Sequence, residues 1–388
     1  MTLVDQYLRL GLAFDRLERG FVDAWTGPAA LRAQVESGPV PTAASLAARA
    51  RDLLRELPSA GLSAERTAFL EGQLTGLLTS ARVMAGEPVA YLDQVQAYFQ
   101  VRPALGPVEA YEAAHRSLDE LLPGDGPLRE RYTAYRDGAC VPADRLAEAV
   151  RSWSTLLRER TRALFPLPDE EVVEYEVVHD KPWAGFNYYL GGFRSTVAVN
   201  ADLPVPLGVL PALVAHESYP GHHTERCRKQ ARAALPELDL WLVNTPENLL
   251  AEGLADLGLR AVGLQSWGQV ATELYADLGI RYDGERGERI ACAAAALGAV
   301  RQDAAILLHD GGASADEAEA HLARWALLSP ERARKTVAFL TDPLWRAYIS
   351  TYVEGERLLS RWLDAGGEYV RLLDEQLTPR RLQGDLAA

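Results

Sequence analysis

The chain has 388 residues, of which 48% are hydrophobic and 24% charged, an ordinary composition for a folded globular protein. This length exceeds that of a typical compact domain, so two associated lobes are expected. The formal net charge of −14 argues against nucleic acid or an anionic membrane surface as the main partner.

The cysteines and the apolar segments limit the cellular context. Cys140, Cys227 and Cys292 are widely spaced and odd in number, which excludes a disulfide scaffold and a thiolate zinc site. Residues 1–20 carry charges within a helical apolar pattern, unlike a secretory signal. No uninterrupted run of about 18 apolar residues occurs, so no membrane span is expected. We therefore predict a cytoplasmic protein without a membrane partner.

The first 165 residues are predicted to form a helical lobe. Apolar positions from Leu8 to Phe21 recur at helical spacing. Further helical patterns follow in residues 64–86, 89–100, 108–122 and 143–165. Turn-forming clusters separate several of them.

The pattern changes near residue 166, where a second lobe (166–388) is predicted to begin. Residues 170–180 alternate and are rich in valine, and residues 193–200 show a similar pattern; both predict strands. Beyond these strands the chain again has helical patterns almost to its end. The expected fold class is mainly α: a multi-helix, two-lobed architecture with a small β-sheet, integrated into one unit.

Histidines cluster in the segment LVAHESYPGHHTE (213–225). The chain has seven histidines, and three of them lie between residues 216 and 223. Neutral imidazole is a frequent zinc ligand, and a glutamate directly after the first histidine resembles the zincin arrangement, where it acts as the general base. Position 220 is proline, however, so the HExxH spacing is absent.

Pro220 and Gly221 allow two histidines to meet despite this spacing. On an ideal helix, His222 would be rotated by about 240° and raised by about 9 Å relative to His216. Because Pro220 interrupts a helix and Gly221 tolerates unusual backbone, a distorted turn can bring His222 or His223 beside His216. We favour His222 as the ligand and keep His223 as a supporting catalytic residue or the alternative ligand. The competing interpretation is a helix end with unrelated histidines.

A second acidic segment, residues 244–263, is predicted to be a helix starting near Pro246. Glu252 and Asp256 lie four residues apart on one face, among leucines. Carboxylates in apolar surroundings need a partner, and a cation is a natural one. A glutamate ligand followed one turn later by an aspartate that orients a histidine ligand is typical of glutamate zincins. Alternatively, both acids face solvent or pair with Arg260.

These motifs resemble those of a large bacterial family of uncharacterised helical proteins with an HE-x-Y-P-G-H-H motif, grouped with gluzincin-type metallopeptidases. Similar blocks run in family order over nearly the whole chain: FVDAWTGP, NYYLGGFRSTVAVN, AEGLAD, RQDAAILLHDGGASADEA and YISTYVEGERLL. Departures at Leu254 and at Thr224–Glu225 leave the substrate open. The resemblance implies a zincin-like fold with Zn²⁺ in a cleft.

The resemblance also implies roles for individual residues. His216, His222 and Glu252 would hold the metal, with Glu217 as base. Residues 193–200 would form the strand that pairs with the substrate backbone. Tyr352, with Tyr348 behind it, would donate a hydrogen bond to the oxyanion. Four further residues would line the cleft and bind substrate: Tyr219, Arg194, Tyr188 and His309.

The function expected from the sequence is therefore zinc-dependent hydrolysis of a peptide or a small-molecule amide, with Glu217 acting on water. Two alternatives stay open. One is a metal-dependent lyase, cyclase or transferase that acts on a small metabolite. The other is a non-catalytic helical binding protein with a vestigial metal site. The sequence does not determine the oligomeric state.

Overall fold

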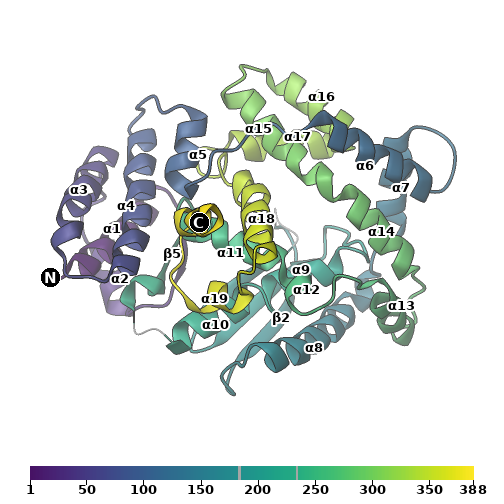
Figure 1. Ribbon diagram of the computed structural model, residues 1–388, viewed down its shortest axis with the longest axis horizontal. Helices are drawn as coiled ribbons and strands as arrows, with labels where there is room; N and C mark the ends of the chain where they lie inside the picture. Colours follow the sequence, from purple (N-terminus) through teal and green to yellow (C-terminus); the bar gives the residue numbers. More distant parts are fainter. Residues whose placement is uncertain (182–184, 233–234) are drawn as a thin grey trace.

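A computed structural model gives the fold and describes residues 1–181, 185–232 and 235–388. The chain is mainly helical with small sheets, which confirms the predicted fold class (Figure 1). The first helices are α1 (Leu3–Leu17), α2 (Ala29–Ser37), α3 (Ala43–Glu56), α4 (Ala64–Met84), α5 (Tyr91–Phe99), α6 (Val108–Leu121), α7 (Leu128–Gly138) and α8 (Leu146–Leu164).

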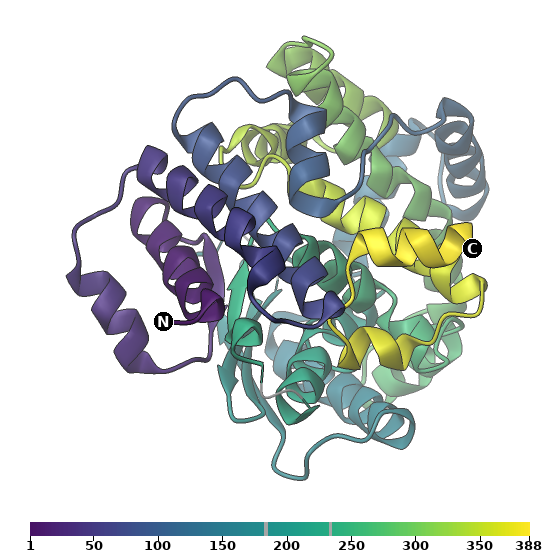
Figure 2. The ribbon, with the colours of Figure 1, turned by 60° about the vertical axis from the view of Figure 1, so that its left-hand side comes forward.

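Local sequence signals explain where the early helices start. Thr2 caps α1, with Asp5 completing a reciprocal capping box, and Ser63 caps α4. The helices α1, α3 and α4 pack on one another at one side of the molecule (Figure 2). Predicted helices of this region therefore form close to the expected residues.

The helices of the second half surround the site described below. They are α9 (Leu210–Glu217), α10 (His222–Arg232), α11 (Pro246–Asp256), α12 (Gly258–Ala261), α13 (Gly268–Asp277), α14 (Gly284–Ala294), α15 (Val300–His309), α16 (Ala315–Trp325), α17 (Pro330–Thr341), α18 (Ile349–Asp364), α19 (Tyr369–Asp374) and α20 (Pro379–Ala387).

Two small sheets complete the fold. β2 (Val172–Val178), β4 (Arg194–Asn200) and β3 (Gly185–Gly191) form one sheet, in which β4 is central, parallel to β2 and antiparallel to β3. β1 (Val22–Trp25) pairs antiparallel with β5 (Leu240–Leu242). The sequence predicts β2 and β4 but not β1, β3 or β5.

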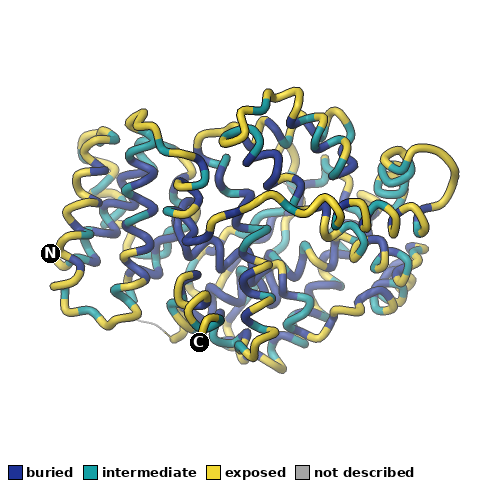
Figure 3. Tube along the Cα trace, turned by 45° about the horizontal axis from the view of Figure 1, so that its top comes forward, coloured by how far each residue is buried: buried dark blue, intermediate teal, exposed yellow. Residues whose placement is uncertain are grey.

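The hydrophobic core has two clusters. The smaller one combines residues between Val4 and Ala81 with residues 238–243 and Leu344. The larger one runs from Tyr91 to Leu382. Buried residues concentrate inside the molecule while outward-facing helix surfaces are exposed (Figure 3). Helices between residues 91 and 165 share their core with the second half, so the division of the core does not coincide with the lobe boundary expected at residue 165.

The backbones of α11 and α18 are in direct contact where the two helices cross. A Cβ on Gly253 would lie 2.5 Å from the carbonyl carbon of Gly355, and a Cβ on Gly355 would lie 2.5 Å from the carbonyl oxygen of Leu249. Both positions therefore require glycine, because any side chain would push the helices apart. This contact places the first turns of α18 against the acidic face of α11.

One helical stretch, Gly284–His309, is long and apolar enough to cross a membrane by length and composition alone. It contains α14 and α15 and contacts α6, α13 and α16. Ile290, Leu297 and Val300 of this stretch belong to the larger core cluster. One side of the stretch therefore packs in the core, and 44% of its most apolar window is buried.

Candidate metal centre

The HE-x-Y-P-G-H-H segment forms two helices joined by a tight turn. α9 ends at Glu217 and α10 starts at His222. Pro220 lies between them, and the peptide bond that precedes it is cis. Because proline cannot donate to a helix ladder and its ring clashes with the preceding turn, the chain leaves the helix here, as the sequence predicts.

Gly221 completes the turn through a very close backbone approach. Its N–H donates to the carbonyl of Ala215 over 2.9 Å. A Cβ at this position would lie 1.9 Å from the carbonyl oxygen of His216, which only glycine avoids. The turn thereby returns His222 to the side of His216.

Three side chains meet at this point. The Nε2 atoms of His216 and His222 are 3.1 Å apart. Glu252, on α11, places Oε2 3.3 Å from Nε2 of His216 and Oε1 3.5 Å from Nε2 of His222. Two nitrogens bound tetrahedrally to zinc at about 2.0–2.1 Å lie about 3.3 Å apart. The group, whose ligand atoms all lie within 4.8 Å of one another, could hold a metal ion.

The surroundings of these residues fit a cation. Nδ1 of His216 lies 2.8 Å from Oδ1 of Asp256, an outer contact that fixes the tautomer with Nε2 free. Oε1 of Glu252 accepts a hydrogen bond from the Tyr348 hydroxyl over 2.9 Å. Oε2 of Glu252 is buried, and apart from Nε2 of His216, 3.3 Å away, no described residue contributes a hydrogen bond to it, so a cation would stabilise this oxygen. Two imidazoles and one carboxylate form a donor set suited to zinc.

The pKa shifts of His216 and Glu252 also favour a cation at this site. Burial lowers the pKa of His216, but hydrogen bonds to Asp256 and Glu252 outweigh it and raise this pKa well above its usual value. Burial raises the pKa of Glu252, but hydrogen bonds from His216 and His222 outweigh it and bring this pKa far below its usual range. The site thus favours positive charge between its carboxylates, and a bound metal would replace a proton there.

Glu217 lies beside the three residues and faces a cavity of about 1590 Å³. Its main-chain carbonyl accepts a hydrogen bond from Nδ2 of Asn187 over 2.5 Å, which ties the end of α9 to β3. Its carboxylate makes no hydrogen bond with a described residue. Burial raises the pKa of Glu217, opposed by the positive charge of His216 and His222. A raised pKa makes this carboxylate a stronger base.

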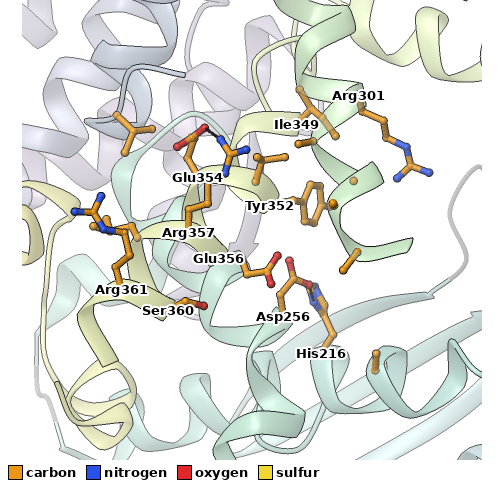
Figure 4. Close-up of a pocket in the computed structure, with 18 of the residues that line it drawn as sticks. His216, Asp256, Arg301, Ile349, Tyr352, Glu354, Glu356, Arg357, Ser360 and Arg361 are labelled. Atoms are coloured by element: carbon orange, nitrogen blue, oxygen red, sulfur yellow. Dashed lines mark hydrogen bonds and ion pairs between the residues drawn. The ribbon is translucent and has the colours of Figure 1, made fainter. Parts of the chain in front are cut away.

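Tyr348, directly before α18, and Tyr352, one helical turn later, make different contacts. Tyr352 lines the cavity near Asp256 and His216 (Figure 4), and its ring centroid is 6.5 Å from that of His216. Its hydroxyl makes no hydrogen bond with a described residue, whereas the Tyr348 hydroxyl is held by Glu252. Only Tyr352 is therefore available to a substrate in the cavity.

Two predicted residues lie away from the cavity. His223 is fully buried, with Nδ1 2.8 Å from Oγ of Ser195 and Nε2 3.1 Å from Oε2 of Glu171. Tyr219 is 1% exposed and donates to the same Glu171 oxygen over 2.6 Å. Successive helical residues are rotated by about 100°, so His222 and His223 point to different sides. The structure therefore places His223 and Tyr219 in a buried network and not on the cavity wall, and their predicted roles in catalysis and substrate binding stay predictions.

Glu171 is the centre of this buried network. Its Oε1 accepts hydrogen bonds from Arg158 over 2.7 Å and from Arg162 over 2.8 Å. Burial raises the pKa of Glu171, but hydrogen bonds from His223, Tyr219 and the two arginines outweigh it and lower this pKa to about 2. The network fixes the back of α10, and nothing in the sequence alone distinguishes Glu171 from its acidic neighbours.

Glu171 is expected to contribute to acid unfolding. Its folded pKa of about 2 is below its ordinary value of 4.5, so its stabilisation is complete above pH 4.5 and is lost as the pH falls toward 2. A shift of this size corresponds to at most about 3 kcal/mol. Urea unfolding of Glu171→Gln should show lower stability at pH 7 and a flatter pH dependence below pH 4.5. The exposed Glu174→Gln is the control, and an unchanged pH slope in Glu171→Gln would contradict the assignment.

Arg194 and His309 also do not line the cavity. The Arg194 guanidinium pairs with the exposed Glu174 over 3.0 Å. Nε2 of His309 donates to the Leu340 carbonyl over 2.7 Å, and its ring stacks on Tyr91. One side chain is thus paired at the surface and the other is bonded to the main chain, and their predicted contacts with substrate stay predictions.

The strand next to the site is β3, not β4. β4 is the central strand and uses both of its edges, whereas β3 pairs with β4 alone among the described strands. Gly185 of β3 lines the cavity. Tyr188 points to the opposite face, is 42% exposed and does not line the cavity. The prediction that residues 193–200 present the substrate-pairing edge is therefore wrong, whereas the substrate contact predicted for Tyr188 stays a prediction.

Asp23 is a residue near the site that the sequence does not single out. It lies on β1, 3.6 Å from the Arg226 guanidinium. Burial raises its pKa and the charge of Arg226 opposes this, with smaller effects of His222 and Glu252. The N-terminal segment thus contributes charge beside the ligands. The only signal for it is the block FVDAWTGP, which carries no recognised chemistry.

No protein-family model and no curated protein matches this chain. Among solved structures, the chain is similar to a presumed lipoprotein from Colwellia psychrerythraea, with a TM-score of 0.54 and 14% identity over 90% of this chain and 70% of that one. It is also similar to a presumed lipoprotein of unknown function from Shewanella oneidensis, with a TM-score of 0.52 and 14% identity over 100% and 83% of the two chains. An M32 carboxypeptidase from Deinococcus radiodurans R1 gives a TM-score of 0.40 and 14% identity over 98% and 92%.

At this identity, the two better matches establish a shared helical fold and nothing about activity. The class that fold and site define is a mainly helical protein with a His/His/Glu group that could hold a metal ion. Membership of the family with the HE-x-Y-P-G-H-H motif stays a prediction.

Proposed function

We propose that this chain is a zinc-dependent hydrolase of peptide or amide bonds. The observation that carries the proposal is the meeting of His216, His222 and Glu252 beside Glu217, with His216 and Glu217 on the wall of a large cavity. Three protein ligands leave a coordination position open, which is typical of catalytic rather than structural zinc.

Glu217 carries the proton transfers. Its carboxylate takes a proton from the attacking water and delivers it to the departing nitrogen. Burial favours this role, because it raises the pKa of Glu217. The chemistry that zinc supplies when bound is Lewis acidity, which activates water and polarises a carbonyl.

Two other elements complete the reaction site. The Tyr352 hydroxyl faces the cavity and donates a hydrogen bond to the oxygen on which negative charge develops. The edge of β3, which starts at the cavity with Gly185, binds an extended substrate backbone by strand addition. Asp256 keeps His216 oriented through its Nδ1 contact.

Metal analysis tests the first step of this proposal. Tag-free protein loaded with zinc is expected to retain one ion per chain by plasma mass spectrometry, and His216→Ala is expected to lose it. His179→Ala, on an exposed histidine that pairs with Asp202, is the matched control and should keep the ion. If the zinc-loaded wild type retains no metal and shows no thermal shift, the hydrolase proposal fails and a non-catalytic binding role becomes the better explanation.

A further inference from the structure

The charges that line the cavity are unevenly distributed. Acidic groups gather at the ligand end, where Glu217 and Asp256 lie beside His216. Glu356, on α18, adds to them: burial raises its pKa, and the charge of Asp256 raises it further. Figure 4 shows Glu356 and Asp256 facing each other, with Arg301 on another part of the wall. The cavity is therefore acidic near the metal ligands and basic at Arg301.

Arg301 differs from most other basic residues of this wall in having no partner. It lies in the first turn of α15, is an exposed residue that lines the cavity, and makes no hydrogen bond or ion pair with a described residue. Loss of hydration lowers the pKa of its guanidinium, and the nearby charges of Arg136 and Arg332 contribute. An arginine without an acid beside it, close to other cations, favours an anion from outside the chain.

Other cations on the same wall are neutralised or remote. Three of them form ion pairs within the chain: Arg102 with Asp93, Lys335 with Glu331 and Arg357 with Glu354. Arg361 is exposed like Arg301 and makes no ion pair with a described residue, but it lies nine residues beyond Tyr352 on α18, about 13.5 Å along the helix.

Arg301 lies close to the proposed reaction centre. Its charge interacts with Tyr352, whose ring centroid is 6.5 Å from that of His216. In Figure 4 Tyr352 lies between Arg301 and the pair formed by His216 and Asp256. A group held by Arg301 would therefore lie across Tyr352 from a carbonyl placed at the metal ligands.

We propose that Arg301 binds a carboxylate of the substrate, and that the substrates of this chain are amides or short peptides with a free carboxylate. This inference rests on the proposed hydrolase function. The planar guanidinium binds a carboxylate through two parallel hydrogen bonds. Such charge-assisted bonds are worth about 1.5–3 kcal/mol, which corresponds to a preference of at least about tenfold over a neutral amide.

Calorimetric titration of zinc-loaded Glu217→Gln, which binds substrate without turning it over, tests the inference. The probes form two pairs. N-acetyl-alanyl-leucine carries an α-carboxylate and its C-terminal amide carries none. The α-amide of N-acetyl-alanyl-aspartate carries only the side-chain carboxylate, and the diamide carries none. At least one carboxylate probe is expected to bind at least tenfold more tightly than the neutral amides. The α-carboxylate and side-chain forms show which carboxylate is recognised.

The same titrations with a second substitution decide whether Arg301 is responsible. Arg301→Gln should abolish the preference, Arg301→Lys should keep part of it, and Arg361→Gln, a second unpaired arginine of the cavity, should keep all of it. Circular dichroism and zinc content should match the parent in each. A preference that persists in Arg301→Gln, disappears in Arg361→Gln, or is absent from the parent would overturn the inference, as would failure of all probes to bind.

Hydrolysis by the wild type is measured separately, so that the two proposals fail independently. If the wild type cleaves no amide but Arg301→Gln abolishes carboxylate preference in binding, the hydrolase function fails and the carboxylate site stands. If the wild type cleaves acid and amide forms equally well, the hydrolase function stands and the carboxylate site fails.

Discussion

Replacing Glu217 by glutamine is expected to reduce hydrolysis about 10²- to 10⁴-fold while zinc stays bound. Glutamine has nearly the same size but cannot take a proton from water. The atoms that could hold the metal belong to His216, His222 and Glu252, so the substitution leaves them in place. Cleavage of a peptide mixture followed by mass spectrometry, together with zinc content per chain, measures both effects.

The control for this variant is Glu176→Gln, which removes one carboxylate from the exposed face of β2 and should leave cleavage unchanged. If Glu217→Gln loses its zinc, Glu217 is itself a ligand and the base lies elsewhere. If it keeps both zinc and full activity, the proton transfers use another group.

Gly221→Ala is expected to abolish zinc binding and to lower the free energy of unfolding by at least about 2 kcal/mol. The added methyl group would lie 1.9 Å from the His216 carbonyl oxygen and 2.5 Å from that of Ala215. Both contacts are with backbone, so no side-chain rotation relieves them. The turn must open, and His222 then moves away from His216.

Urea unfolding and zinc content measure this effect. Gly384→Ala, in α20, is the matched control, since a Cβ there meets nothing within 4 Å and alanine favours helix by about 1 kcal/mol over glycine. It should be neutral or stabilising. A Gly221→Ala variant as stable as the wild type, with zinc retained, would show that the turn adopts another geometry.

Local sequence signals predict much of the fold and part of the candidate site. Capping residues and helical periodicity locate the early helices, because these signals act within one or two turns. Pro220 and Gly221 predict the interruption between α9 and α10, because the backbone constraints of proline and the freedom of glycine are properties of the residue types themselves. Glu252 and Asp256 are recognisable because two carboxylates among leucines require a partner.

The positions of β3, Arg194 and His223 depend on contacts between distant parts of the chain, which no short segment predicts. β3 has the sequence GFNYYLG, in which Tyr188 and Tyr189 are adjacent, so no alternation distinguishes this strand from a loop. Its place as the outer strand follows from pairing with β4, which also puts Arg194 at the surface. His223 is held in its buried position by Glu171, which comes 52 residues earlier and whose Oε2 lies 3.1 Å from Nε2 of His223.

Helix crossing determines the tyrosine geometry in the same way. Tyr348 and Tyr352 reach α11 because Gly253 and Gly355 let the two backbones touch. Neither glycine has a positive φ, so neither is marked by turn chemistry. Their role emerges only when both helices are placed together.

The pairing of β1 with β5 has a consequence for biosynthesis. The cluster built by the first helices includes Leu240, Leu242 and Val243, which are made long after Ala81. At about 5–20 residues per second, roughly 8–30 s pass between these points on the ribosome. During that interval the apolar faces of α1, α3 and α4 lack part of their covering, so this end of the molecule is where the nascent chain most needs protection by a chaperone.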